Sequence, residues 1–462
     1  MKKDWYLISA VLITLISRLI FAFNWHEVWW DAGVYIGMGK FLFSLGQSGL
    51  WEHIRPPLLP VVLGFFWLIG LSLTFFGRLI EILLMSGIVF FVYSLGKSWF
   101  DKRVAFLASL LVCFSPIFIY LSFHIYTEIP AVFLVLFSLW LFNKKKYFWS
   151  GLTVGLAFLA KFPAGIFFPI LVYLIWRQKR QLRSLISGFV VPVIPYLLIS
   201  WIAYGSPWAF FTAASDAIGR ALGCNVLRYH EWHYYFWLLW NSEVKFSVLA
   251  AIGVVALFLK RIRVRYLLFA CLFLPLLYFM SLHCRDYRYL ALIYPFIAIL
   301  ASFGFVFLFG FLKKRAFTIV AILLAVWFAF VGFQFYFGNE VQSPDTIAEE
   351  YFAYLQDKEI SGEVWISNPI IAAHTDAKLH KIYYPIYDEG VSKQFIDYLG
   401  ANINKIQFVM LDNCGGGLIC AEDDTVCNQN TDEVISLLDE NFDLVFNKTK
   451  GRCWYKVWAT SP

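Results

Sequence analysis

The sequence predicts a polytopic α-helical membrane protein that carries a smaller α/β domain at its C-terminal end. Hydrophobic residues make up 60% of the 462 residues and charged residues only 15%, so water is not the main solvent for most of the chain. Apolar stretches recur at about 20 residues, the length that crosses the hydrocarbon layer of a membrane. Residues 1–338 hold 29 Lys and Arg against 11 Asp and Glu, whereas residues 339–462 hold 9 against 20. We therefore predict a basic membrane domain, 1–338, and an acidic soluble domain, 339–462.

Eleven apolar segments are candidate membrane spans. They are residues 5–23, 78–96, 103–122, 126–142, 147–160, 163–177, 184–204, 243–260, 265–283, 288–311 and 315–337. The first segment follows only Met1 to Asp4 and has no small-residue cleavage site after it. We interpret it as a retained helix rather than a signal peptide.

Basic residues predict how these spans are oriented. The clusters lie at residues 2–3, 97–103, 144–146, 177–183, 260–265 and 313–315, which are alternate connections between the spans. They hold 19 of the 29 basic residues of the membrane domain. Since positive charge marks cytoplasmic loops, we expect the N-terminus in the cytoplasm and the C-terminal domain outside the cell membrane.

Two segments of the membrane domain fit a spanning role less well. Residues 57–75 are apolar, but a full crossing there would invert every later loop, so we expect this segment to dip into the outer leaflet or to pack within the protein. Residues 33–45 have apolar positions at helical spacing. They predict either a helix lying flat at the interface or an ordinary loop helix.

The C-terminal domain alternates strand-like and helical segments. We predict strands at 363–367, 407–411, 443–446 and 454–458, and helices at 346–356, 393–399 and 433–438. This alternation is typical of a small α/β domain.

Cysteines gather in the same domain. Four of the eight lie close together, namely Cys414, Cys420, Cys427 and Cys453. An even-numbered cluster predicts two disulfides and an oxidising compartment. Zinc binding is the competing interpretation, but the spacing lacks the tight pairs of zinc knuckles, which favours disulfides without deciding how the cysteines pair.

Charged residues on the predicted outer side are the candidate site residues. Four cations are expected near the outer boundary: Arg55, Lys161, Arg285 and Arg288. Any one of them is equally well explained as a side chain that snorkels to the interface, whereas several together indicate a binding site for an anionic head group.

Of the carboxylates on that side, two are the candidate site residues. Asp31 follows Trp29 and Trp30 in the first outer loop, and Glu128 begins the span 126–142. A carboxylate can remove the proton from a reacting hydroxyl, while cations stabilise a departing phosphate. The structural alternative for Asp31 is the N-cap of the helix 33–45.

Two histidines near these carboxylates make a metal site an alternative interpretation. A divalent metal held by Asp31, Glu128 and His53, with His26 nearby, is the arrangement to consider. No paired H-x3-H spacing supports it, and a lone interfacial histidine is more often a hydrogen-bonded structural group.

Six motifs in a fixed order resemble one known family. They are W-D-A-G-x-Y around Asp31 to Tyr35, R-P-P-L from Arg55, S-P-x-F from Ser115, T-E-I-P from Thr127, G-L-A-F-L-A-K ending at Lys161, and R-Y-L-A-L-I-Y-P from Arg288. This order is similar to that of the protein O-mannosyltransferase and aminoarabinose-transferase group, which are dolichyl-phosphate-mannose mannosyltransferase-like membrane enzymes of the GT-C fold. The resemblance covers about residues 5–311 and implies that fold here.

The resemblance also implies roles for the site residues. Asp31 would be the catalytic base, or would organise the acceptor site. The substrate-binding residues would be Tyr35, Arg55, Glu128, Lys161, Arg285 and Arg288. Family members usually carry Asp-Glu in the first loop, but Asp31 is followed here by Ala32, which leaves the acceptor chemistry undetermined.

The resemblance implies a glycosyltransferase. Its donor would be a polyprenyl (dolichyl or undecaprenyl) phosphate sugar, its acceptor a protein, glycan or lipid hydroxyl, and the anomeric centre would invert. Membrane lipid is an expected partner, and nucleic acid is not, because the basic charge is spread over short loops. A transporter or flippase of an anionic or lipid-linked substrate is the main rival, although no half-to-half correspondence is visible in the sequence. A non-catalytic assembly partner would not need the outer charges.

Overall fold

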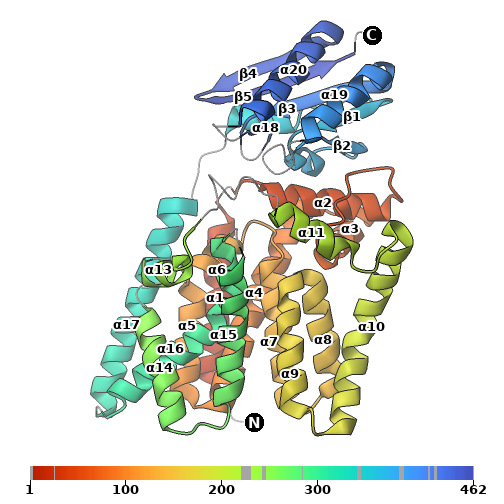
Figure 1. Ribbon diagram of the computed structural model, residues 1–462. Helices are drawn as coiled ribbons and strands as arrows, with labels where there is room; N and C mark the ends of the chain where they lie inside the picture. Colours follow the sequence, from red (N-terminus) through yellow and green to blue (C-terminus); the bar gives the residue numbers. More distant parts are fainter. Residues whose placement is uncertain are drawn as a thin grey trace. The chain divides into compact units, whose positions relative to one another are not determined.

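The computed structural model divides the chain into two compact units (Figure 1). The structure describes residues 4–24, 26–219, 230–241, 246–282, 285–311, 313–340, 345–383, 390–414, 417–420 and 424–460. Unit 1 comprises residues 1–26, 78–207 and 230–342, and unit 2 comprises residues 27–77, 208–229 and 343–462. Residues 27–77 thus belong to the same unit as the C-terminal residues. The predicted division at 338/339 concerns membrane and solvent, and it stays a prediction.

Unit 1 is a bundle of apolar helices. They are α1 (Trp5–Ala22), α4 (Leu73–Trp99, whose first turn belongs to unit 2), α5 (Lys102–Phe114), α6 (Pro116–Leu121), α7 (Glu128–Asn143), α8 (Tyr147–Ala160), η1 (Phe162–Ile166), α9 (Phe167–Ile175), α10 (Lys179–Tyr204), α13 (Tyr234–Asn241), α14 (Phe246–Leu259), α15 (Arg265–Ser281), η2 (Tyr287–Leu292), α16 (Tyr294–Phe309), α17 (Lys314–Phe335) and η3 (Tyr336–Glu340).

The apolar helices fall into two classes of length. Among the described residues, four helical segments are long and apolar enough to cross a membrane: Trp5–Ala22, Leu73–Trp99, Lys179–Tyr204 and Thr318–Asn339. Other apolar helices are shorter, at 10–17 residues. The protein is therefore a helical membrane protein by composition, and the number of eleven spans stays a prediction.

Small residues let the helices of unit 1 approach closely. A Cβ atom at Gly188 of α10 would overlap the carbonyl oxygen of Phe148 in α8, and one at Gly151 of α8 would overlap that of Leu185. Helices in a membrane gain little from the hydrophobic effect, so they associate through such backbone contacts. This contact fixes α8, whose last residue directly precedes Lys161, against α10.

A buried arginine stabilises the break between α5 and α6. Arg18 of α1 donates from Nη2 to the carbonyl oxygen of Cys113 at 2.7 Å and from Nε to Ser122 Oγ at 3.1 Å. The next helix begins at Pro116, which has no N–H to give to the last carbonyls of α5. Since backbone groups in an apolar environment need partners, Arg18 supplies one.

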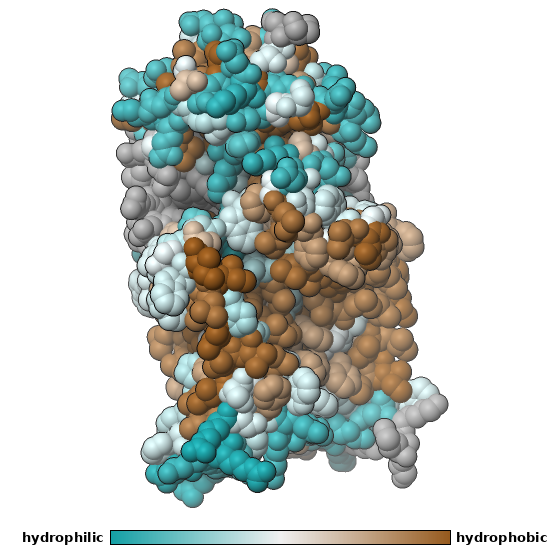
Figure 2. Space-filling model, turned by 90° about the vertical axis from the view of Figure 1, so that its right-hand side faces the viewer, coloured by the Kyte–Doolittle hydropathy of each residue, from teal (hydrophilic) through white to brown (hydrophobic). Residues whose placement is uncertain are grey.

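The basic connections of unit 1 share one end of the bundle. Figure 1 shows the N-terminus, the α9–α10 connection and the α14–α15 connection at the same end. Figure 2 shows a hydrophilic band there, next to a broad hydrophobic surface. This grouping agrees with the charge pattern of the sequence, while the face of the membrane to which this end belongs stays a prediction.

Unit 2 is built on a five-stranded sheet. Its strands are β1 (Glu363–Ile366), β2 (Leu379–Lys381), β3 (Ile406–Asp412), β4 (Asp443–Lys450) and β5 (Cys453–Ala459), in the order β2-β1-β3-β5-β4. β1 is parallel to β2 and β3, and β5 is antiparallel to β3 and β4. The helical elements are α2 (Trp30–Phe43), α3 (Leu58–Leu68), α11 (Ala209–Gly219), α18 (Thr346–Phe352), η4 (Pro369–Ala373), α19 (Gly390–Asn402), η5 (Ile403–Lys405) and α20 (Thr425–Asn441).

The two faces of this sheet are covered by helices from different parts of the sequence. Along β3, Val409 and Leu411 pack with residues of α19 and α20, whereas Phe408 and Met410 lie in a second core with α18. Alternate strand residues point to opposite faces, which explains the division. Val34 and Met38 of α2 belong to that second core. α2 is therefore part of the hydrophobic core of the C-terminal domain.

The structure confirms most predicted elements of the C-terminal domain. All four predicted strands and all three predicted helices form, whereas β2, three residues long, and the short helices η4 and η5 were not predicted. The predicted cysteines form two disulfides, Cys414–Cys453 and Cys420–Cys427, with Cα–Cα distances of 5.4 and 5.7 Å. Disulfides rather than zinc are thus the state of these four residues.

The two less regular segments of the sequence also have defined structures. Residues 33–45 fall largely within α2, and the run 57–75 is divided between α3 and the start of α4. Gly70, at φ 75°, lies between these helices. The run is therefore not one spanning helix, and its depth in the membrane stays a prediction.

Candidate active site

In unit 2, the carboxylate of Asp31 is paired with the guanidinium of Arg55. Arg55 Nη1 lies 2.7 Å from Asp31 Oδ1, and only 20% and 10% of the two side chains are exposed. α2 begins at Trp30 with Trp29 as its N-cap, and no side chain caps it. The alternative that Asp31 caps this helix is therefore wrong, because the helix starts before Asp31 and places it in the first turn.

A second carboxylate holds the other edge of Arg55. Glu52 is fully buried, and its Oε2 accepts from Arg55 Nε at 3.2 Å. Its Oε1 accepts from the hydroxyl of Tyr383 and lies 3.9 Å from Lys381 Nζ. A buried carboxylate needs such donors and counter-charges, because burial removes its water. Tyr383 and Lys381, both in the C-terminal domain, thereby hold the carboxylate that binds Arg55.

Tyr35 joins the same cluster. It lies one helical turn after Asp31 in α2, so both side chains occupy one face of the helix. The guanidinium carbon of Arg55 lies 5.8 Å from the centre of the Tyr35 ring, a distance at which a cation is attracted by the ring. The structure therefore brings together three predicted site residues of unit 2.

In unit 1, Glu128 and Lys161 form an ion pair. Lys161 Nζ lies 2.8 Å from Glu128 Oε1, with side-chain exposures of 13% and 2%. Glu128 is the first residue of α7, and Lys161 directly follows the last residue of α8. Lys161 Nζ also lies 5.2 Å from the centre of the Tyr289 ring. The ends of two neighbouring helices thus hold a cation and a carboxylate in contact, and the ring of Tyr289 in η2 lies beside the cation.

A second ion pair lies in the segment that carries Tyr289. Arg288 donates from Nε at 3.2 Å and from Nη2 at 3.0 Å to Oδ2 of Asp286, whose other oxygen accepts from the backbone N–H of Arg288. Its guanidinium carbon lies 4.7 Å from the centre of the Tyr126 ring. Asp286 thus caps η2 and orients Arg288 at once.

The third predicted cation of unit 1 has different partners. Arg285 donates from Nη1 to the carbonyl oxygen of His230 and from Nη2 to that of Met280, the latter at 2.8 Å. Carbonyl oxygens accept hydrogen bonds without neutralising a positive charge. These contacts therefore orient Arg285 while leaving its charge in place.

Two charged residues of α4 support this part of unit 1. Glu81, 1% exposed, accepts from the backbone N–H groups of Ile125 and Tyr126 at 2.9 and 2.6 Å, and Arg78 donates to the carbonyl oxygen of Phe123 at 3.1 Å. Ile125 has a φ of 55°, an unusual conformation for a β-branched residue that needs support from its surroundings. Arg78 and Glu81 are not among the predicted site residues. The feature of the sequence that points to them is two charges three residues apart within an apolar span.

The metal hypothesis receives no support from the described part of the chain. There, no group of three His, Cys, Asp or Glu side chains is arranged to hold a metal ion. Asp31 and Glu128 are each paired with a cation instead. His26 Nε2 lies 3.1 Å from the carbonyl oxygen of Phe21, and its ring stacks on Phe123, so this histidine is structural.

His53 lies beside the Glu52 cluster. Burial lowers its pKa below the ordinary value, the positive charge of Lys381 lowers it further, and Glu52 opposes the shift. The neutral imidazole is therefore favoured at this position.

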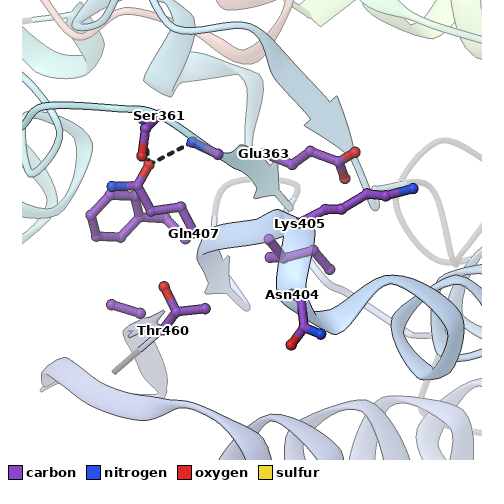
Figure 3. Close-up of a pocket in the computed structure, with 10 residues that line it drawn as sticks. Ser361, Glu363, Asn404, Lys405, Gln407 and Thr460 are labelled. Atoms are coloured by element: carbon purple, nitrogen blue, oxygen red, sulfur yellow. Dashed lines mark hydrogen bonds between the residues drawn. The ribbon is translucent and has the colours of Figure 1, made fainter. Parts of the chain in front are cut away.

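A shallow cavity in the C-terminal domain is not formed by predicted site residues. Figure 3 shows Gln407 beside Ser361, with Glu363, Lys405 and Thr460 around the opening. The amide oxygen of Gln407 accepts from the backbone of Ser361 and Gly362 at 2.7 and 2.8 Å. The side chain of Gln407, in β3, thus binds the backbone directly before β1.

Comparisons with known proteins agree with the family that the motifs resemble. Residues 54–204 match the family described as dolichyl-phosphate-mannose-protein mannosyltransferase. An uncharacterized protein of Aquifex aeolicus is 26% identical over 325 residues, which cover 66% of this chain and 73% of that protein.

Solved structures share the fold over most of the chain. ArnT from Cupriavidus metallidurans in the apo state matches with a TM-score of 0.66 and 13% identity, covering 98% of this chain and 97% of its own. The oligosaccharyltransferase of Archaeoglobus fulgidus, tethered to an acceptor peptide, matches with a TM-score of 0.62 and 13% identity, covering 100% of this chain and 74% of its own. The chain therefore has the fold of the GT-C membrane glycosyltransferases, as the resemblance predicted, and its residues 54–204 match the dolichyl-phosphate-mannose-protein mannosyltransferase family.

Proposed function

We propose that this protein transfers a sugar from a polyprenyl-phosphate donor to an acceptor hydroxyl at the outer face of the membrane, with inversion of the anomeric centre. The fold and the family match support a glycosyltransferase that uses a lipid-phosphate-linked donor. ArnT has been solved with undecaprenyl phosphate, and the archaeal oligosaccharyltransferase AglB with dolichol-phosphate and an inhibitory peptide. We extend the same class of donor to this chain.

The observation that carries the proposal is the group of oriented cations in unit 1. Lys161 and Arg288 are each held by a carboxylate and placed against an aromatic ring, and Arg285 is held by two carbonyls. We assign all three to the phosphate of the donor. Cations that are already oriented stabilise the charge that develops on a leaving phosphate without reorganising during the reaction.

Asp31 is the proposed base. The acceptor hydroxyl passes its proton to the Asp31 carboxylate, and the hydroxyl oxygen bonds to the anomeric carbon. The bond between that carbon and the phosphate oxygen breaks, and its electron pair leaves with the phosphate. The products are the glycosylated acceptor and polyprenyl phosphate. Arg55 favours the ionised form of Asp31 and fixes its orientation, which a base requires.

Tyr35 and Arg55, which lie beside Asp31, remain substrate-binding residues in this proposal. Glu128 acts in this proposal by holding Lys161.

A transfer assay tests the proposal. The full chain in nanodiscs is given radiolabelled mannosyl or aminoarabinosyl polyprenyl phosphate with a Ser/Thr peptide, a lipid-linked glycan or a hydroxylated lipid. We expect label on one acceptor class and an equal amount of free polyprenyl phosphate. A parallel flux assay in proteoliposomes addresses the transporter alternative, because movement of the carrier across the bilayer without sugar transfer would contradict the proposal.

We also propose that the N-terminus is cytoplasmic and that residues 339–462 are extracytoplasmic. Two disulfides in the C-terminal domain and the shared end of the basic loops support this orientation. A cysteine at exposed Lys145 should react with a membrane-impermeant maleimide only in permeabilised cells, and one at exposed Lys358 in intact spheroplasts. The parent chain measures the background, and the reverse result would contradict the orientation.

A further inference from the structure

We infer that the C-terminal domain is a positioning element for the proposed catalytic base, acting through Tyr383, Glu52 and Arg55. The inference rests on the proposed function for its catalytic meaning. It gives the C-terminal domain a role in the reaction and identifies Tyr383 as a positioning residue.

The first step is the integration of the loop that carries Asp31 into the C-terminal domain. Gly49 donates its N–H to the carbonyl oxygen of Ala377 at 2.8 Å, and its own carbonyl oxygen accepts from Leu379 at 2.8 Å. A Cβ atom at Gly33 of α2 would lie 2.5 Å from the carbonyl oxygen of Pro369. Backbone contacts at these distances fix α2 and the 49–57 loop to the C-terminal domain, so the position of that domain determines theirs.

The second step is a chain of polar contacts from that domain to Asp31. The Tyr383 hydroxyl donates to Oε1 of Glu52, Oε2 of Glu52 accepts from Nε of Arg55, and Nη1 of Arg55 lies 2.7 Å from Asp31. Glu52 is fully buried. A planar guanidinium bound to carboxylates along two edges has one orientation, so Glu52 determines where Arg55 meets Asp31.

The third step is that Tyr383 determines the position of Glu52. Of the two oxygens of Glu52, Arg55 Nε engages one, and Tyr383 engages the other together with Lys381 at 3.9 Å. The Tyr383 ring contacts Trp30 edge-on, with 4.8 Å between ring centres. Trp30 directly precedes Asp31, so Tyr383 contacts both the side chain next to the base and the polar route to the base.

Tyr383→Phe isolates the hydroxyl, because phenylalanine keeps the ring contact with Trp30. Its matched control is Tyr398→Phe, since Tyr398 also donates its hydroxyl to a carboxylate of this domain, at 2.7 and 2.8 Å from Glu363. We expect Tyr383→Phe to lower kcat by about tenfold to a hundredfold, the value of one hydrogen bond to a charged group, with the KM for the donor unchanged. Tyr398→Phe should stay within about twofold of the parent.

A double-mutant cycle tests the route. If Tyr383 acts through Glu52, Tyr383→Phe should cost less than about twofold when it is added to Glu52→Gln, because the contact is already altered. Full multiplication of the two losses, wild-type kcat in Tyr383→Phe, or an equal loss in Tyr398→Phe would each overturn the inference.

Hydrogen exchange separates this inference from the proposed function, because it needs no activity. In nanodiscs, Tyr383→Phe should raise amide exchange in residues 50–57, where the N–H of Arg55 donates to the carbonyl of Glu52 at 3.2 Å, and Tyr398→Phe should not. Unchanged exchange in that segment would overturn the positioning role even if sugar transfer is found. Raised exchange in a protein that transfers no sugar would uphold the positioning role and contradict the proposed function alone.

Discussion

Lys161 Nζ lies 2.8 Å from Glu128 Oε1 at the meeting point of two helix ends, and the pair is almost removed from solvent. Glu128 is 2% exposed. Removing one partner of such a pair leaves the other charge buried without compensation, which costs more than the pair itself contributes. The pair therefore has a structural and a proposed functional role that can be separated by mutation.

Lys161→Met should lower the free energy of unfolding by about 3 kcal/mol, because it leaves the Glu128 carboxylate buried without its cation. Adding Glu128→Gln should restore most of this loss, since no buried charge then remains. Thermal unfolding measures both effects, and binding of undecaprenyl phosphate should remain weak in both variants. Recovery of phosphate binding together with stability would remove Lys161 from the donor site.

Asp31→Asn should lower transfer by about a thousandfold, the usual contribution of a general base, while binding of undecaprenyl phosphate is retained. Asparagine keeps the size of the side chain and can still accept from Arg55, so folding should persist. Asp432→Asn, at an exposed position of α20, is the control and should transfer normally. Normal transfer by the Asp31 variant would exclude this residue as the base.

Glu81→Ala should lower kcat/KM by about tenfold to a hundredfold, because two buried backbone N–H groups of the Ile125–Tyr126 segment lose their acceptor and the segment shifts. Glu81→Gln should lose less, since one carbonyl oxygen remains. Ser86→Ala removes another buried polar group of α4 that bonds only within its own helix, to Ile82, and serves as the control. Equal losses in Glu81→Ala and Ser86→Ala would argue for a general effect on the helix.

The C-terminal domain should lose stability as pH rises toward neutrality because of Asp412. Burial raises the pKa of Asp412 to about 7, and hydrogen bonds from Ser367, Asn368 and the backbone of Cys414 oppose the shift only in part. The folded state therefore holds a proton that the unfolded chain releases above about pH 4. This group lowers stability by about 1.4 kcal/mol per pH unit between pH 4 and 7.

Asp412→Asn should remove that slope, because an amide does not titrate. Thermal unfolding of the parent protein and of the variant is measured at pH 5 and pH 7.5. The quantity to compare is the change in stability between the two pH values, because the substitution itself also alters the stability. Parallel pH dependences would show that Asp412 titrates normally.

Reducing agents should destabilise the C-terminal domain unequally through its two disulfides. Loss of Cys414–Cys453, which joins residues 39 apart, should cost about 4 kcal/mol by the loop-entropy relation, and loss of Cys420–Cys427, 7 apart, about 2 kcal/mol. Thermal unfolding of the paired Cys→Ser variants checks the order. Peptide mapping without reduction should recover these two pairs, and any other pairing would contradict the structure.

Local patterns in the sequence predicted much of this protein. Apolar runs predicted a helical membrane protein, alternation predicted four of the five strands, and the cysteine cluster predicted two disulfides. The two-residue period of β3 divides its side chains between two cores, which is a property that neighbouring residues reveal. β2 was not predicted because three residues are too few to show the two-residue period of a strand.

The sequence by itself determined which parts of the chain are apolar or charged and which residue types are available for chemistry, since hydrophobicity and charge are properties of single residues and short windows. Only the tertiary structure decided that α2 packs into the core of the C-terminal domain, and that Glu52 and Tyr383 meet although 331 positions separate them. Such a contact leaves no periodic signal, because it depends on where the whole chain folds. The partner of Asp31 was decided in the same way: a capping role fits the local sequence, but the helix starts one residue earlier and the carboxylate binds Arg55.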